Sequence, residues 1–149
     1  MTQTPKLRTF LWFGGRLDEA LTFYKQTFSD AIVHGENRMP DGVLFTADFS
    51  IYGHEFIGMN WAGAPEFNEA ISLSLSVDGQ EETDRLWDAI TKDGTPGNCG
   101  WCTDPFGVTW QVTPFQLREH VENPDPEKAA YAMTALRSMG KIVLRDLYE

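Results

Sequence analysis

The residues with the clearest chemical potential are two cysteines in the stretch CGWCTDPFGVTWQVTP, residues 99–114. Cys99 and Cys102 are the only cysteines of the chain, and their spacing is Cys-x-x-Cys. Such a pair is typical of thiol-disulfide oxidoreductases and of structural zinc sites. The residues that follow, Asp104-Pro-Phe-Gly107, are instead typical of a turn between two strands. The chemistry of the pair therefore depends on the element that carries it.

A strand is the element that this stretch favours. On an extended strand, residues three apart point to opposite faces, with Cα atoms about 10 Å apart, whereas a disulfide requires less than about 7 Å. A redox pair of the thioredoxin type begins a helix, and here a turn and a strand follow. A zinc site needs further ligands, and the histidines at positions 34, 54 and 120 have no matching spacing. We therefore expect two free thiols in a β-hairpin.

Polar side chains alternate with apolar ones in three of the expected strands, which predicts one polar face in each. The three rows are Ser72, Ser74 and Ser76; Thr109, Gln111 and Thr113; and Thr46, Asp48 and Ser50. Asp48 is the only carboxylate among them, so it is a weak candidate for a general base or an orienting acceptor. The alternative is that these faces are solvated, as one side of an antiparallel sheet often is.

The tryptophans fall into two groups. Trp12, Trp87 and Trp110 lie at positions expected to face the core. Trp61 lies where a strand gives way to an Ala-Gly-Ala-Pro loop, and Trp101 lies between the cysteines. Because loops at sheet ends commonly carry ligand contacts, we expect these two indoles at the rim of a binding site for a flat or partly apolar molecule.

Composition bounds the class of protein. A chain of 149 residues with 42% hydrophobic and 13% aromatic residues is typical of a compact globular domain. The 22 acidic and 12 basic residues give a net charge of −10, which repels nucleic-acid phosphates and anionic membranes. No apolar run is long enough for a membrane span, and no signal-peptide pattern is present. We expect a cytoplasmic protein that binds neither nucleic acid nor membrane.

The elements that position these residues form a pattern that occurs twice. A strand, a Gly-Gly turn, a helix and two paired strands are expected at 7–13, 14–15, 16–28, 43–51 and 54–60. A strand at 72–77 and a helix at 82–90, with a capping-box-like Asp78-Gly-Gln-Glu81, begin the repeat. Strands around 99–102 and at 108–114 complete it. A short helix is expected at 116–120, and Asp125 and Pro126 begin a further helix that Gly140 closes.

Four segments together resemble a known family. They are FGGRLDEALTFYKQTF, FNEAISLSLSVDGQEETDRLWDAI, CGWCTDPFGVTWQVTP and DPEKAAYAMTALRSMGKI. The sequence is similar to the PhnB-like branch of the glyoxalase/bleomycin-resistance (vicinal oxygen chelate) superfamily, many of whose members are named 3-demethylubiquinone-9 3-methyltransferase. The resemblance covers nearly the whole chain. Cys102 departs from it, because an aliphatic residue is expected there.

The resemblance implies an α+β fold in which two tandem β-α-β-β-β modules form a cupped, incomplete barrel. We expect one domain over 1–149, with module one at 7–61, module two at 70–114 and a C-terminal helical extension at 115–149. It also implies a homodimer. Two short modules leave open sheet edges. We expect such an edge, or a second subunit, to be covered by the apolar tail 142–144 and by one face of the last helix, with Ala129, Met133 and Leu136. The alternative is that this material packs on its own chain.

The resemblance also places the metal-ligand positions of metal-using members. Thr9, Ser72 and Gln111 occupy three of them, and Met59 or Asn60 is the candidate for the fourth. Because neutral threonine, serine and glutamine side chains supply neither imidazole nor carboxylate, we expect no metal ion and predict no cofactor.

The proposed pocket collects the polar rows and the rim indoles around these positions. Its expected residues are Thr9, Leu11, Asp48, Asn60, Trp61, Ser72, Ser74, Trp101, Thr109 and Gln111. The sequence favours a small-molecule binding protein or a metal-independent enzyme, and it leaves open whether any reaction is catalysed. A non-catalytic, ligand-sequestering protein of the resistance type is the alternative. Methyl transfer rests on the family name alone, because Gly14-Gly15 is not the Gly-rich loop of a Rossmann-like methyltransferase.

Overall fold

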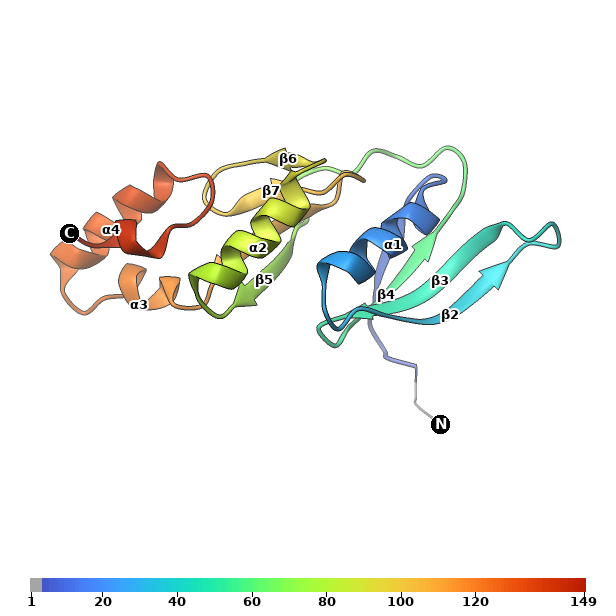
Figure 1. Cartoon of the computed structure of the whole chain (residues 1–149), viewed down its shortest axis with the longest axis horizontal. Coiled ribbons are helices and arrows are strands. Elements are labelled where there is room, and N and C mark those ends of the chain that lie inside the picture. Colours follow the sequence, from blue (N-terminus) through green and yellow to red (C-terminus); the bar gives the residue numbers. More distant parts are fainter. Residues whose placement is uncertain (1–3) are drawn as a thin grey trace. The chain divides into compact units, whose positions relative to one another are not determined.

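Two β-α-β-β-β modules and a helical extension make up the computed structural model of the protein, which describes residues 4–149 (Figure 1). The chain divides into two compact units, the first ending at Glu66 and the second spanning Phe67–Glu149. Each unit contains one four-stranded sheet. The expected α+β class and the tandem repeat are thereby confirmed, and each sheet is open rather than closed into a barrel.

The first module contains β1 (Thr9–Trp12), α1 (Leu17–Thr27), β2 (Ile32–Arg38), β3 (Leu44–Ile51) and β4 (His54–Met59). Its sheet has the order β1-β4-β3-β2, with β1 parallel to β4 and the other pairs antiparallel. Tyr52 (φ 49°) and Gly53 (φ 77°) both adopt the left-handed conformation that a two-residue hairpin turn requires between β3 and β4.

The core of the first module lies between α1 and one face of its sheet. Tyr24 of α1 stacks on Phe49 at 6.0 Å between ring centroids, and Phe49 stacks on Phe56 at 5.0 Å. Gly58 lets the helix approach β4, because a Cβ there would overlap the side chain of Leu17. The alternation of the strands therefore leaves their other face free of α1.

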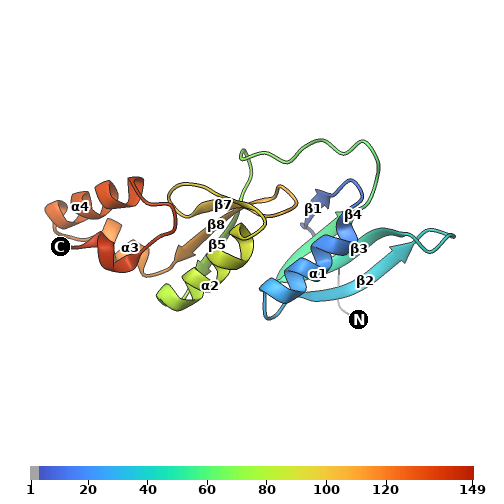
Figure 2. The same cartoon turned by 45° about the horizontal axis from the view of Figure 1, so that its top comes forward.

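The second module contains β5 (Leu73–Val77), α2 (Gly79–Thr91), β6 (Thr95–Pro96), β7 (Trp101–Thr103) and β8 (Thr109–Pro114). Its sheet has the order β5-β8-β7-β6, with β5 parallel to β8. Figure 2 shows α2 beside the strands of this sheet, and the helix packs on β8 and β7. The helix buries Leu86 and Ile90 against the sheet residues Trp110 and Val112, all at most 2% exposed.

The start of α2 differs from the expected capping box. Asp78 is the N-cap residue, but its side chain makes no capping hydrogen bond. Gln116, far along the chain, takes this role: its side-chain oxygen accepts from the Gly79 N–H at 3.0 Å, and its amide donates to the Asp78 carboxylate at 2.6 Å. A side chain that follows β8 thus fixes the strand-to-helix turn.

The C-terminal extension comprises α3 (Leu117–Val121), α4 (Pro126–Arg137) and a 3-10 helix η1 (Leu144–Leu147). As expected, Asp125 caps α4 by accepting from the Glu127 N–H at 3.0 Å. Ile142 and Leu147 are each 1% exposed, so the tail packs on its own unit. Among the described residues, no helix is both long and apolar enough to cross a membrane.

Candidate ligand pocket

The polar face of the second sheet is the central feature of the candidate site. Leu75, Val77, Trp110 and Val112 are buried on the side covered by α2, as the sequence predicted. The opposite side is formed by paired residues of β5, β8 and β7. These pairs are Ser74 with Gln111, Ser76 with Thr113, Gln111 with Trp101, and Thr109 with Thr103. The sheet therefore presents hydroxyls, an amide and one indole on its open side.

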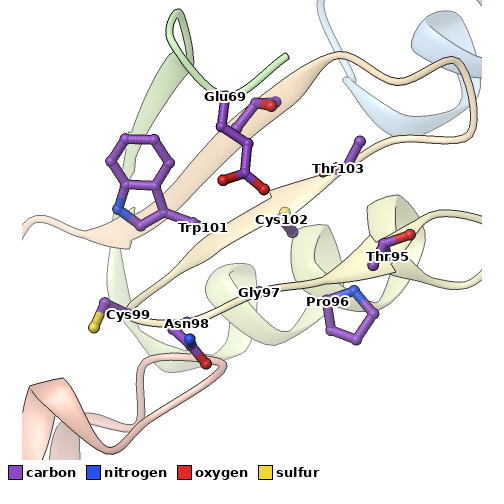
Figure 3. Close-up of a pocket in the computed structure, with 10 residues that line it drawn as sticks. Glu69, Thr95, Pro96, Gly97, Asn98, Cys99, Trp101, Cys102 and Thr103 are labelled. Atoms are coloured by element: carbon purple, nitrogen blue, oxygen red, sulfur yellow. The ribbon is translucent and has the colours of Figure 1, made fainter. Parts of the chain in front are cut away.

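A pocket of about 360 Å³ lies on this open side (Figure 3). We call it the Trp101 pocket. Its lining residues are Glu69, Thr95, Pro96, Gly97, Asn98, Cys99, Trp101, Cys102, Thr103 and Thr109. The segment before β5 contributes one wall: the carbonyl of Asn68 lies 3.5 Å from the Thr109 hydroxyl, and Thr109 is only 4% exposed.

The lining of the Trp101 pocket contains one carboxylate and no lysine, arginine or histidine. Figure 3 shows the Glu69 carboxylate reaching over β7 between the side chains of Trp101 and Thr103. Within residues 4–149, Glu69 makes no ion pair and its side chain no hydrogen bond, and the Trp101 indole N–H also has no partner. The pocket thus offers an acceptor, a donor and an aromatic surface that intramolecular contacts leave unused.

The turn that precedes β7 forms a second wall, and the C-terminal tail holds it. The N–H groups of Cys99 and Gly100 donate to the carbonyls of Met139 and Gly140, both at 2.8 Å. Gly100 has φ 84°, and a Cβ there would lie 2.8 Å from the Ile142 side chain. The extension is therefore bonded to the rim of the pocket.

Both thiols are held by contacts within the protein, Cys102 by burial and Cys99 by a hydrogen bond. Cys102 is buried beneath α2, and burial, with the nearby Asp104 carboxylate, raises the pKa of its thiol to about 12. Cys99 donates to the Leu136 carbonyl at 3.3 Å. Both cysteines are free, as expected. The geometric premise was partly wrong, however, because Cys99 lies in the turn before β7 at φ 57° rather than on the strand.

Asp104 stabilises the turn between β7 and β8. Asp104 is 2% exposed, and its carboxylate accepts from the N–H groups of Phe106 and Val108 and from the Trp110 indole at 2.9 Å to 3.0 Å. These three bonds account for the Asp-Pro-Phe-Gly turn that follows the cysteines, and they explain how a carboxylate is tolerated next to the core.

The remaining site residues expected in the second module lie on the same open face. Gln111 donates its amide to the Ser72 hydroxyl at 2.8 Å, and Ser74 is exposed beside Gln111 in the sheet register. Of the expected residues, Trp101 and Thr109 line the pocket itself, while Ser72, Ser74 and Gln111 continue the face beyond it.

The expected residues of β1 lie on the side of the first sheet that α1 covers. Leu11 is 8% exposed and packs in the core, so its side chain serves packing. The Thr9 hydroxyl lies 2.9 Å from His54 Nε2. Asp48 lies on the opposite side, exposed, and pairs with Arg8 at 3.2 Å. The structure therefore does not bring Asp48 together with Thr9 and Leu11.

Asn60 and Trp61 follow β4, and Asn60 has a structural role. Its side-chain oxygen accepts from the Leu17 N–H at 2.8 Å, and its amide donates to Asp18 and to the Leu44 carbonyl at 3.0 Å. Asn60 thus caps α1, whose own N-cap residue makes no side-chain capping bond.

Trp61 is 54% exposed and packs edge-on against Phe45 at 5.7 Å. It lines a smaller hollow of about 250 Å³ in the first module. Trp12 was expected in the core, but it is half-buried on the face opposite Leu11, and its indole donates to the Trp61 carbonyl at 2.7 Å.

The positions implied for a metal are engaged in other bonds: Thr9 with His54, Ser72 with Gln111, and Asn60 with α1. In residues 4–149, no group of three or more histidine, cysteine, aspartate or glutamate side chains is arranged to hold a metal ion.

Sequence reasoning missed Glu69, Thr95 and Thr103 as pocket residues. Thr103 had a local signal, since it lies two residues after Trp101 on one strand and so shares its face. Glu69 and Thr95 had none, because the path of the segment before β5 and the pairing of β6 are set by tertiary contacts.

Comparisons with known proteins agree with this architecture. The family model of 3-demethylubiquinone-9 3-methyltransferase matches residues 5–113. A putative 3-demethylubiquinone-9 3-methyltransferase, PhnB protein, from Bacillus cereus is 27% identical, with a TM-score of 0.67, and the match covers 74% of this chain and 99% of that one. No curated protein gives a significant match.

Two further solved structures share the fold. The protein PA1353 from Pseudomonas aeruginosa is 21% identical, with a TM-score of 0.62 over 74% of this chain and 98% of that one. The fosfomycin resistance protein FosX from Listeria monocytogenes, solved with Mn(II) and sulfate, is 14% identical, with a TM-score of 0.52 over 72% and 90% of the chains. With the match over residues 5–113, the chain belongs to the PhnB-like 3-demethylubiquinone-9 3-methyltransferase family of glyoxalase-fold proteins.

Proposed function

We propose that this protein binds a small molecule in the Trp101 pocket, either to sequester it or to convert it without a metal ion. One observation carries the proposal: a concave site of about 360 Å³ on a polar sheet face combines an indole, threonine hydroxyls and a carboxylate. Ligand pockets combine apolar or aromatic surface with a few polar groups that fix orientation in this way.

The metal-independent part of the proposal is supported by the bonds at the positions discussed above. Thr9, Ser72 and Asn60 are each engaged by a protein partner, and none of the three side chains is anionic. A divalent cation would have to displace these bonds and would gain only neutral oxygens. Elemental analysis of the untagged protein tests this: stoichiometric zinc, nickel or iron that is lost in Gln111→Ala would contradict it.

We do not propose methyl transfer, despite the family name. Each sheet here has four strands and one parallel pair, next to antiparallel ones. A doubly wound parallel sheet with a Gly-rich first turn is the arrangement that holds a dinucleotide, and Rossmann-like methyltransferases use a similar one. Gly14 and Gly15 make the short turn from β1 to α1 in a different kind of sheet.

A thermal-shift screen over a metabolite library tests ligand binding. A ligand at a hundred times its dissociation constant stabilises the folded state by about 2.7 kcal/mol. Trp101→Ala should abolish the shift produced by a genuine hit, whereas Trp61→Ala, which removes an exposed indole from the other unit, should leave it unchanged. Hits that depend on Trp61 and not on Trp101 would contradict the placement of the ligand.

Incubation of each hit with the protein, followed by mass spectrometry of the small molecule, separates the two forms of the proposal. Turnover that Trp101→Ala removes indicates an enzyme, and tight binding without chemical change indicates a sequestering protein. Asp48 is paired with Arg8 on the other module, so we expect Asp48→Asn to leave binding at Trp101 unchanged.

We also propose a cytoplasmic homodimer. The two free thiols suit a reducing compartment. Phe10, at 53%, and Ile32, at 53%, are exposed on β1 and β2, the two edge strands of the first sheet, where a second copy would cover them. Light scattering at micromolar concentration should give about twice the 16.8 kDa of one chain, and a value near 16.8 kDa would contradict the dimer. Subcellular fractionation tests the compartment.

A further inference from the structure

We propose that the ligand of the Trp101 pocket is an organic cation, a substituted ammonium that carries a flat or apolar group. This inference rests on the proposed function and narrows it to one class of ligand. It follows from the charge and the aromatic surface of the lining, which together favour a ligand with a positive charge.

The Glu69 carboxylate determines which sign of charge the pocket favours in a ligand. Its carboxylate reaches into the pocket (Figure 3), and among the described residues no cation pairs with it and no donor binds its side chain. The lining contains no lysine, arginine or histidine that could neutralise an anion. A cation entering the pocket therefore gains an attraction that is otherwise unused, and an anion meets a repulsion that no cationic side chain of the lining offsets.

The long-range field acts in the same direction. The whole chain carries a net charge of −10, so cations are concentrated near its surface and anions are depleted. The effect on association is weakened by salt, because the screening length is only about 8 Å at physiological ionic strength. Glu69 is exposed, but its carboxylate lines the pocket and would lie at contact distance from a ligand, so its attraction is screened less than that of the distant charges.

The aromatic surface comes from Trp101, which is 37% exposed and makes no ring contact with another aromatic side chain of the described residues. Tryptophan is the best aromatic partner of an ammonium group, and the interaction strengthens as water is removed. The hydroxyls of Thr95, Thr103 and Thr109 surround the same space and can accept from an N–H group or contact a methylated one through their methyl groups.

A set of three probes of similar shape tests the inference. Benzyltrimethylammonium is the cation, benzyl methyl sulfone the neutral compound and benzylsulfonate the anion. Affinity is measured by titration of the full chain, with the Trp101 indole N–H resonance as the site-specific signal. We expect benzyltrimethylammonium to bind at least tenfold more tightly than either of the others and to move the Trp101 resonance.

Two matched variants isolate the carboxylate. Glu69→Gln removes the charge and keeps the shape, and it should weaken benzyltrimethylammonium at least fivefold while leaving benzyl methyl sulfone unaffected. Glu66→Gln makes the same change of net charge three residues earlier, outside the lining, and should leave both affinities unchanged.

The possible failures are distinguishable. Equal binding of the three probes at Trp101, tighter binding of benzylsulfonate, or identical affinities in Glu69→Gln and Glu66→Gln would overturn the cation inference and leave the proposed pocket standing. Binding of the cation that leaves Trp101 unmoved and shifts residues near His120 and Tyr148, which line another hollow, would also overturn it. If neither these probes nor any hit of the metabolite screen affects Trp101, the proposed function fails as well.

Discussion

Gln80 offers the sharpest test of how the C-terminal tail supports the pocket. Its side-chain amide donates to the Ile142 carbonyl at 2.8 Å, and its oxygen accepts from the Leu144 N–H at 2.8 Å. Gln80→Ala removes both bonds to the tail, each of which contributes about 0.5 to 1.5 kcal/mol net. It also removes the bond that the Gln80 amide donates to Asp84 at 2.9 Å within α2. Alanine recovers a few tenths of a kcal/mol through its helix propensity. We therefore expect the free energy required to detach the tail from the second unit to fall by about 2 kcal/mol.

Amide hydrogen exchange reads out this loss at the rim of the pocket. The N–H groups of Cys99 and Gly100 are bonded to the tail carbonyls of Met139 and Gly140, so opening of the tail exposes them. A loss of about 2 kcal/mol corresponds to roughly 30-fold faster exchange. Gln26→Ala, the same substitution at an exposed position of α1, is the control. Equal exchange of these two amides in both variants would refute the coupling between tail and pocket.

Three other perturbations test separate parts of the structure. Asn60→Ala removes the cap of α1 and should cost about 1 to 2 kcal/mol in urea unfolding, with faster exchange at the Leu17 N–H, and an unchanged rate there would count against the cap. The pKa of Cys102 is about 12 in the folded state and 9.0 in the unfolded state. The neutral thiol therefore contributes fully to the free energy of unfolding below pH 9, and this contribution falls as the pH rises because the unfolded chain ionises first. The wild type should thus lose about 1.4 kcal/mol more than Cys102→Ala between pH 7 and pH 10, and parallel pH profiles would exclude this. Truncation after Ser138 should destabilise the protein. A shortened chain that is dimeric by light scattering and equally stable would show that the tail covers nothing important.

The fold could be predicted from local patterns, because each module depends on short-range alternation. SLSLSV places its serines and its aliphatic residues on opposite faces of one strand, and the structure buries Leu75 and Val77 as that pattern requires. The same rule predicted the faces of β8. The alternation placed Thr109 on the open side, but it did not predict that Thr109 is only 4% exposed. The segment around Asn68 that covers Thr109 is distant in sequence, so no local pattern indicates it.

The site was predicted less well, because several roles depend on partners far along the chain. Asn60 looked like a candidate pocket residue, yet it caps a helix that begins 43 residues earlier. The start of α2 depends on Gln116 rather than on the nearby Glu81, so a capping-box pattern was present without its bonds. No local pattern indicates that the Glu69 carboxylate lies beside Trp101, because the path of the segment before β5 brings it there.

We propose that the ligand lies against Trp101 on the open face of the second sheet. The five tryptophans give five indole N–H resonances, which single Trp→Phe variants assign. The indole of Trp110 is bonded to Asp104 and that of Trp12 to the Trp61 carbonyl, whereas the Trp101 indole has no partner among the described residues. We expect any ligand that raises the melting temperature to shift the Trp101 resonance most. A stabilising ligand that shifts the Trp61 or Trp12 resonance and leaves Trp101 unchanged would contradict it.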